Sequence, residues 1–276
     1  MPGVLLLLVL FLGDLRTGIH PLIKGYRFMR RIGSTEYSGV YLAERESTHL
    51  RVVLKVLRQM PGDDDDSGAF DRFLQEYETI ADMEHPNIVR IYDLGVSDDH
   101  AHIAMEYLAG GDLRTRIEAG IPERQSVQYL RQIAAALSAV HEKGVLHRDL
   151  KPGNIMLRKD GSIALIDFGL AKRAKLESEI TDKGEIFGTP YYMSPEQGHG
   201  NGVDERSDIY SLGVSLHQAL TGQLPFRRLT GNVEVDFINR WRGKGAGTPS
   251  LRHEVFRLLT HARELVGRCL ATDREV

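Results

Sequence analysis

Two short segments of the sequence concentrate the residue types that bind metals and exchange protons. Residues 147–154 read HRDLKPGN, and residues 167–169 read DFG. Carboxylates and amides are oxygen-rich groups that suit a hard cation such as Mg²⁺, and carboxylates also take up protons. The residue types alone do not choose between such chemistry and a loop that holds two buried salt bridges.

In this order, the two strings resemble the catalytic loop and the metal-binding loop of the protein kinase family. The resemblance implies transfer of the γ-phosphoryl group of ATP to a protein hydroxyl, a reaction in which the protein positions the reactants and neutralises spreading charge. It implies that Asp149 is the base that orients the substrate hydroxyl and that Lys151 lies beside the transferring group. Asn154 and Asp167 would hold Mg²⁺.

Residues nearer the N-terminus resemble the parts of this family that hold the phosphates of ATP. Lys55 in VVLKVL has the place of the strand lysine that pairs with the α- and β-phosphates, and Glu76 has the place of its helix partner. Without that context, a solvent-facing strand lysine is the more common reading. Residues 32–40 read IGSTEYSGV, where only Gly33 matches a glycine of the family pattern, so we predict weaker or slower nucleotide handling; a simple hairpin turn is the alternative.

The other nucleotide-binding candidates lie around MEYL at 105–108, which looks like the hinge between two lobes. Met105 would be the gatekeeper, and adenine would meet the backbone at Glu106 and Leu108. Asp112 is where the family often places a ribose contact, and a helix N-cap is an equally open alternative. The implied ATP-binding set is Ile32, Gly33, Val40, Val53, Lys55, Met105, Glu106, Leu108, Asp112 and Met156.

Residues 188–196 read GTPYYMSPE and resemble the end of the kinase activation segment. Thr189, together with Lys151, follows the serine/threonine pattern. Glu185 stands where many relatives carry a phosphorylatable threonine, so we hypothesise that its carboxylate pairs with Arg148 and partly replaces a phosphate. An exposed glutamate in a loop is the alternative. The regulatory candidates are Arg148, Ser178, Thr181, Glu185 and Thr189.

The periodicity along the chain predicts an α+β fold with two lobes. Short apolar and β-branched runs bounded by turns, such as 102–108, dominate residues 26–108, and one amphipathic helix is expected at 70–83. Helical spacing dominates from residue 109, most clearly at 127–142 and 207–220. We expect a kinase domain at 26–276 with an antiparallel-sheet N-lobe (26–108) and a mainly helical C-lobe (109–276).

Two expectations concern the C-lobe of that domain. Asp208 in SDIYSLG resembles the buried aspartate that anchors the catalytic-loop backbone. Residues 268–276, RCLATDREV, resemble the segment before an arginine that pairs with the glutamate corresponding to Glu196. We therefore expect a chain truncated at the C-terminus, with the carboxylate of Glu196 left unpaired.

Composition and charge exclude several other classes of protein. The net charge of −3 and the pI of about 6.4 give no basic field for nucleic acid, so we expect no nucleic-acid partner. The single cysteine, Cys269, excludes an internal disulfide framework. Residues 1–25 form an apolar extension whose run 4–12, VLLLLVLFL, is shorter than the roughly 20 residues that span a bilayer, so we expect no membrane contact through it. A signal peptide, a packed or disordered extension and a start site placed too early all fit this run. An enzyme that needs ATP is expected in the cytoplasm.

We therefore predict a serine/threonine protein kinase that uses ATP and Mg²⁺, phosphorylates protein serine and threonine hydroxyls and autophosphorylates. The alternative is a pseudokinase that binds nucleotide or partners without transfer, because the glycine loop is altered and the C-terminal end is missing. A small-molecule phosphotransferase is a third reading. GTPYYMSPE, which resembles a protein-substrate platform, argues against it.

Overall fold

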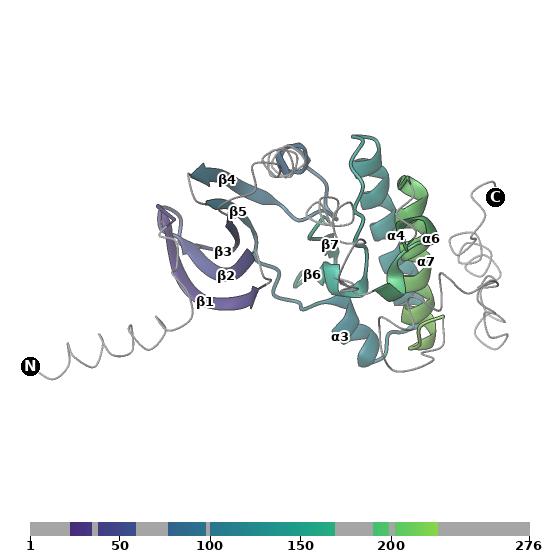
Figure 1. The fold of residues 1–276 in the computed structure, drawn as a ribbon. Helices are drawn as coiled ribbons and strands as arrows, with labels where there is room; N and C mark the ends of the chain where they lie inside the picture. The colour runs from purple at the N-terminus through teal and green to yellow at the C-terminus, as the bar shows by residue number, and fades with distance from the viewer. Residues whose placement is uncertain are drawn as a thin grey trace, which may run out of the picture.

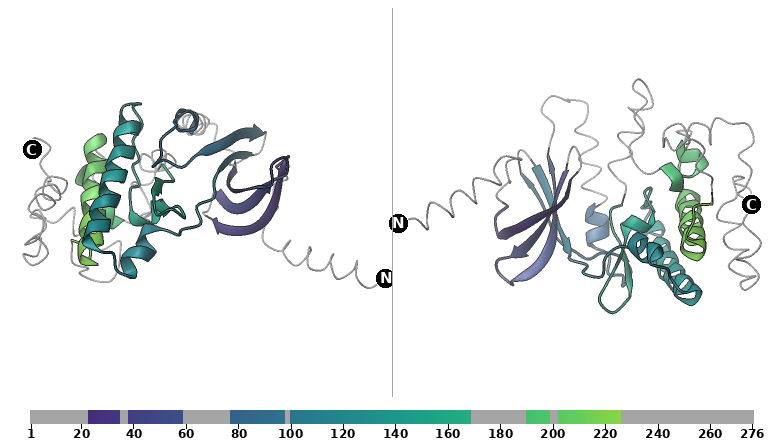
Figure 2. Two further views of the ribbon diagram at one scale, coloured as in Figure 1. Left: turned by 180° about the vertical axis from the view of Figure 1, so that it is seen from behind. Right: turned by 90° about the horizontal axis from the view of Figure 1, so that it is seen from below.

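The computed structural model of the chain describes residues 23–34, 38–58, 77–97, 100–168, 190–198 and 202–225. A five-stranded antiparallel sheet lies at one end, a group of helices lies at the other, and a two-stranded sheet lies between them (Figure 1, Figure 2). The strands are β1 (Tyr26–Ser34), β2 (Ser38–Arg45), β3 (Leu50–Arg58), β4 (Ile91–Ser97), β5 (His100–Glu106), β6 (Ile155–Leu157) and β7 (Ile163–Leu165). The helices are α3 (Leu113–Glu118), α4 (Glu123–His141), α6 (Pro195–Gly198) and α7 (Glu205–Thr221), with 3-10 turns η2 (Pro152–Asn154) and η3 (Pro190–Tyr192). The predicted two-lobed α+β arrangement is confirmed.

The large sheet has two different faces because side chains alternate along each strand. Its strand order is β1-β2-β3-β5-β4. On β3, Val52, Leu54 and Val56 are buried in a small cluster on the outer face, with Tyr26 of β1. Lys55 has the opposite parity and therefore points toward the helical lobe. The run predicted at 102–108 leaves the strand after residue 106, because the next two residues begin the connector between the lobes.

Two long helices form the centre of the second lobe. The buried residues of α4 recur every three or four positions: Ser126, Tyr129, Leu130, Ile133, Ala136, Leu137 and Val140. Helix α7 is buried over most of its length, begins at the N-cap Asp204 and ends at Gly222, whose φ of 69° suits glycine. Both helices were predicted. Of the helix expected at 70–83, the structure describes helical residues 77–81, and residues 70–76 lie outside the described ranges.

One hydrophobic core runs from the large sheet to the helices. It includes Ile80, Ile103 of β5, Leu137 of α4 and Leu212 of α7. Residues 87–89 extend alongside β7: Val89 N–H donates to the Leu165 carbonyl, and Leu165 N–H donates to the Asn87 carbonyl, both over 2.9 Å. The segment that follows residues 77–81 is therefore fixed to the second lobe. In the ranges that the structure describes, no helix has the length and apolar character needed to cross a bilayer.

Candidate active site

A buried aspartate on α7 fixes the backbone of the loop at 147–154. Asp208 is 1% exposed and accepts hydrogen bonds from the backbone N–H groups of His147 and Arg148, each over 2.8 Å. Its Oδ2 also lies 2.8 Å from His141 Nε2. Arg148 has a φ of 60°, a left-handed conformation that costs a non-glycine residue about 1–2 kcal/mol. Asp208 therefore holds strained backbone directly before Asp149, which confirms its predicted anchoring role.

The side chains of Asp149, Lys151 and Asn154 form one polar cluster. Lys151 Nζ donates to Asp149 Oδ2 over 2.8 Å. Asn154 Nδ2 donates to the backbone oxygen of Asp149 over 2.8 Å and to its Oδ2 over 3.0 Å. The backbone oxygen of Asn154 accepts from the N–H of Ile166 over 3.0 Å, which places Asn154 beside the residue before Asp167. The three oxygen-bearing side chains singled out in the sequence thus converge.

Lys55 reaches across from the sheet to this cluster. Its Nζ lies 2.7 Å from Asp167 Oδ1, and the two side chains are 17% and 41% exposed. Burial alone would raise the pKa of Asp167, but the Lys55 ammonium holds that pKa below its ordinary value. Burial alone would lower the pKa of Lys55, and the oxygens of Tyr77 and Asp167 raise it above its ordinary value. The lysine therefore stays protonated, and its ammonium lies beside the cluster.

The predicted partner of Lys55 was Glu76, and that residue lies outside the described residues. In the part of the chain that the structure describes, the ion-pair partner of Lys55 is Asp167. Tyr77, 3% exposed on the turn at 77–81, lies beside the same ammonium, and burial raises the pKa of its phenol. Sequence reasoning did not single out Tyr77 as a contact of Lys55, because the neighbouring Glu76 carried the family pattern.

His147 packs behind the Asp167 segment. It is fully buried, its ring centroid lies 4.8 Å from that of Phe168, and its Nε2 lies 3.1 Å from the Ile166 carbonyl oxygen. Burial lowers the pKa of His147, so the imidazole is neutral and Nε2 carries the proton that the carbonyl accepts. Within the described residues, Nδ1 has no hydrogen-bond partner. The histidine thus fixes the backbone just before Asp167.

The connector between the lobes has the features expected of a hinge. Met105 and Leu108 are buried in the common core, and Val53 and Met156 are half-buried against it. Within the described residues, no backbone hydrogen bond uses Leu108, so its N–H and carbonyl can serve a ligand. These four candidates lie between the two lobes, as expected for residues that would line an adenine site.

The remaining nucleotide candidates lie in the β1–β2 hairpin and at the start of α3. Gly33 of β1 pairs with Val40 of β2, so Ile32, Gly33 and Val40 belong to a hairpin at the edge of the sheet. The tip of that hairpin lies outside the described residues. Asp112 is the N-cap of α3, since its Oδ1 accepts from the N–H and the hydroxyl of Thr115 over 2.7 and 2.9 Å. The capping alternative for Asp112 is confirmed, and a ribose contact stays a prediction.

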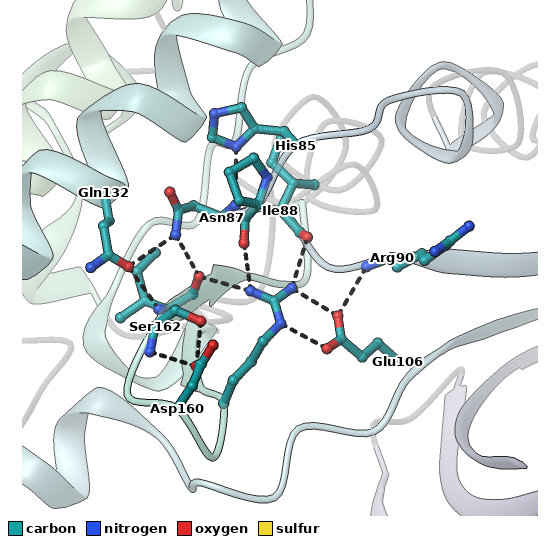
Figure 3. A network of polar contacts seen from close by, with 11 residues as sticks. His85, Asn87, Ile88, Arg90, Glu106, Gln132, Asp160 and Ser162 are labelled. Atoms are coloured by element: carbon teal, nitrogen blue, oxygen red, sulfur yellow. Dashed lines mark hydrogen bonds and ion pairs between the residues drawn. The ribbon is translucent and has the colours of Figure 1, made fainter.

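Arg158, which sequence reasoning missed, ties the hinge to the second lobe. Figure 3 shows the network of polar contacts around its partner Glu106. Arg158 Nε and Nη2 donate to the two carboxylate oxygens of Glu106 over 2.7 and 2.8 Å. Its Nη1 donates to the carbonyls of Pro86 and Ile163, and its Nη2 donates to that of Ile88. All five guanidinium N–H groups therefore have acceptors, which come from three separate segments of the chain.

The regulatory candidates divide between described and undescribed residues. Ser178, Thr181, Glu185 and Thr189 lie outside the described ranges, so the proposed pairing of Glu185 with Arg148 stays a hypothesis. Glu196 is described, and the expectation of an unpaired carboxylate is wrong. The Ser207 hydroxyl on α7 donates to Glu196, and the carboxylate is only half-buried. A neighbouring helix thus supplies a local partner that the sequence pattern did not reveal.

The residues present fit a magnesium-bound nucleotide. Asn154 uses its Nδ2 on Asp149, so its side-chain oxygen is the atom left for a cation. Asp167 uses Oδ1 on Lys55, and its partly exposed carboxylate can bind a cation through Oδ2. In the described residues no cluster of three or more His, Cys, Asp or Glu could hold a metal by itself. Two protein oxygens agree with the usual binding of Mg²⁺, which takes its other ligands from phosphates and water.

Comparison with known proteins assigns this arrangement to a family. The protein kinase domain family matches residues 26–275, so the chain belongs to that family. The chain is 39% identical over 207 residues to serine/threonine-protein kinase pkn2 of Myxococcus xanthus, which covers 73% of this chain and 25% of that protein. It is 38% identical over 203 residues to serine/threonine-protein kinase PrkC of Bacillus subtilis, with 73% and 31% covered.

A longer match extends this likeness toward the C-terminus. Serine/threonine-protein kinase pkn3 of Myxococcus xanthus is 36% identical over 258 residues, which are 90% of this chain and 46% of that protein. The chain thus resembles bacterial serine/threonine kinases and spans less than half the length of these curated relatives.

Proposed function

We propose that this domain is an active serine/threonine protein kinase that transfers the γ-phosphoryl group of ATP to protein hydroxyls. The observation that carries the proposal is the convergence of Asp149, Asn154 and Asp167 opposite Lys55. The named kinase relatives and the retained catalytic side chains favour catalysis over a pseudokinase. The reaction needs ATP, and we infer a cytoplasmic location for the domain on that ground.

The roles of the side chains follow from their contacts. Asp149 accepts the proton of the substrate hydroxyl, and its carboxylate is oriented by Lys151 and Asn154. Lys151 then lies next to the transferring group and offsets its charge. Magnesium, held by Asn154 and Asp167, would neutralise the charge on the phosphate oxygens. Lys55 shifts from Asp167 toward the phosphates when nucleotide binds.

The nucleotide itself lies between the sheet and the helical lobe in this proposal. Adenine meets the backbone of the hinge at Glu106 and Leu108, between Val40 and Val53 on one side and Met156 on the other. Ile32 and Gly33 of β1 cover the phosphates from above, and Met105 limits the depth of the pocket. The single matching glycine supports weaker nucleotide handling than the full pattern gives. A Ser38→Gly variant with a lower KM for ATP would support that reading.

Phosphate transfer from Mg·ATP to a generic protein substrate tests the catalytic roles. Asp167→Asn and Asp149→Asn should lower the rate by about 10²-fold or more. Asp160→Asn is the matched control, because Asp160 caps the β6–β7 turn through Ser162 and lies outside the cluster. Equal phosphate incorporation by wild type and Asp167→Asn rejects the catalytic proposal. A thermal shift with Mg·ATP but no incorporation identifies a pseudokinase.

Further readouts address specificity and regulation. Phosphoamino acid analysis should find phosphoserine and phosphothreonine, in agreement with Lys151 and Thr189. Tandem mass spectrometry of the autophosphorylated chain tests Ser178 and Thr181. If Glu185 pairs with Arg148 in place of a phosphate, Glu185→Ala lowers the activity of dephosphorylated protein. Unchanged activity of that variant removes the hypothesis.

A further inference from the structure

Both the N–H and the carbonyl of Arg148 are hydrogen-bonded to side chains. Its φ of 60° places it in the left-handed region, and the next residue is Asp149. The N–H of Arg148 is held by Asp208 Oδ1 over 2.8 Å. Its carbonyl oxygen accepts a hydrogen bond of 2.8 Å from the side-chain Nε2 of Gln197 on α6. Gln197, on the short helix α6, thus holds the peptide group that joins Arg148 to Asp149.

Both ends of the Gln197 amide are hydrogen-bonded, and the residue is buried. Gln197 is 4% exposed, and its Oε1 accepts from the N–H and the hydroxyl of Ser194 over 3.1 and 3.2 Å. Ser194 is fully buried. A carbonyl can only accept and an N–H can only donate, so these partners fix which end of the amide faces Arg148. A side chain without a donor would remove this hydrogen bond from the Arg148 carbonyl.

We propose that Gln197 is a positioning residue for catalysis, which holds Asp149 in place by hydrogen-bonding the carbonyl of Arg148. This proposal rests on the kinase activity proposed above. Without the hydrogen bond, the Arg148 peptide relaxes from its left-handed conformation, and the carboxylate of Asp149 turns away from the substrate hydroxyl. Loss of this hydrogen bond should therefore lower kcat. The KM for ATP depends on Lys55 and the hinge and stays the same.

Gln197→Glu gives a readout that a purely structural role would not move. When protonated, the introduced carboxyl donates to the Arg148 carbonyl and accepts from Ser194, as the amide does. When ionised, it places a second acceptor against that carbonyl. Burial raises the pKa of a carboxyl by several units, which brings the transition into the assay range. In the described residues, the titratable and charged groups on the segments around this bridge are His147, Arg148, Asp149, Glu196, Arg206 and Asp208.

The expected result is a reversible, pH-dependent loss of kcat. From pH 6 to pH 8.5, the kcat of Gln197→Glu relative to wild type should fall about tenfold or more, while the KM for ATP changes less than about twofold. Gln218→Glu is the matched control, because Gln218 Oε1 only accepts from the Tyr192 hydroxyl, over 2.6 Å, and a carboxylate accepts equally well. Its pH profile should follow that of wild type.

Two further variants complete the test. Gln197→Met, which keeps the length but has no donor, should lose kcat at every pH. Ser194→Ala keeps the backbone N–H that Gln197 accepts from and should stay near wild type. The proposal is overturned if Gln197→Glu parallels wild type across the range, or stays inactive at low pH, or if Gln197→Met retains its kcat. An inactive wild type in the same assay would instead reject the proposed function.

Discussion

Replacing Arg158 by alanine removes five hydrogen bonds that join three segments of the chain. Figure 3 shows the surrounding network, with Glu106 and Ile88 labelled. The guanidinium contacts both oxygens of the Glu106 carboxylate and the carbonyls of Pro86, Ile88 and Ile163. Arg158 and Glu106 are each 21% exposed, so the pair lies between a surface ion pair and a buried one. The Pro86 contact is exposed, and water can replace it.

These contacts set the expected loss of unfolding free energy in Arg158→Ala. A surface pair contributes about 0–1 kcal/mol, and breaking a buried pair costs about 3–5 kcal/mol, which brackets the Glu106 interaction near 1–2 kcal/mol. The partly buried Ile88 and Ile163 carbonyls add about 0.5–1 kcal/mol each when their donor is lost. Arg158→Ala should therefore lower the free energy of unfolding by about 2–4 kcal/mol, and Arg158→Lys by roughly half of that, because lysine keeps the charge but not the planar fork.

A double-mutant cycle isolates the ion pair from the rest of the network. Urea unfolding of Arg158→Ala, Glu106→Ala and the double variant should give a coupling energy of about 1–2 kcal/mol. The exposed pair of Arg27 and Glu44 on the sheet is the matched control and should show clearly weaker coupling. Arg158→Ala should also raise the KM for ATP about threefold or more, because Glu106 belongs to the hinge.

The reasoning fails if the Arg158 and Glu106 effects add without coupling. It also fails if Arg158→Ala unfolds at the urea concentration of wild type. In either case water would satisfy the hinge carboxylate as well as the guanidinium does.

Three further predictions concern other parts of the site. In Asp208→Asn, an NH₂ group replaces one of the two oxygens that accept from the N–H groups of His147 and Arg148. The variant should lose about 2–4 kcal/mol of unfolding free energy, measured with urea, and its kcat should fall at least tenfold. Gly110→Ala places a Cβ against the Leu157 carbonyl and should cost about 1–3 kcal/mol, whereas Gly111→Ala meets open space and should cost about 1 kcal/mol for its φ of 79°; thermal unfolding distinguishes the two. Burial lowers the pKa of His147, so its contribution to stability is complete above the unfolded pKa of about 6.5 and is lost as pH falls through the folded pKa. His147→Gln should therefore flatten the pH dependence of unfolding free energy below about pH 6.5, and an unchanged slope would show that other histidines produce it.

The sequence predicted the lobes, the two long helices and the convergence at Asp149, Asn154 and Asp167. These features follow from local periodicity and from motifs a few residues long, so a linear reading can find them. Asp112 could not be resolved in that way, because an aspartate before a helix satisfies capping and ligand binding equally well. The contact with Thr115 confirms the capping role, and a ribose contact stays a prediction.

Arg158 and Gln197 could not be predicted because their partners lie far away in sequence. Arg158 meets Glu106 across 52 residues, and Gln197 meets Arg148 across 49. The only signals were an arginine just before the Asp-Gly turn at 160–161 and a glutamine after GTPYYMSPE, and neither has a chemical meaning until the fold places its acceptor. Glu196 was misread for the same reason, since its partner Ser207 comes from another helix.

Two ion pairs that join the lobes in the described part of the chain have different expected roles. Lys55 and Asp167 are groups expected to bind phosphate and metal, so a bound nucleotide competes directly with their contact. Arg158 and Glu106 contact each other through side chains, whereas adenine is proposed to use the hinge backbone, so we expect their pair to persist when nucleotide binds. On the proposed function, the first pair rearranges in each catalytic cycle, and the second holds the two lobes in the same relative position. Loss of Arg158 should consequently slow ATP capture more than it slows phosphoryl transfer.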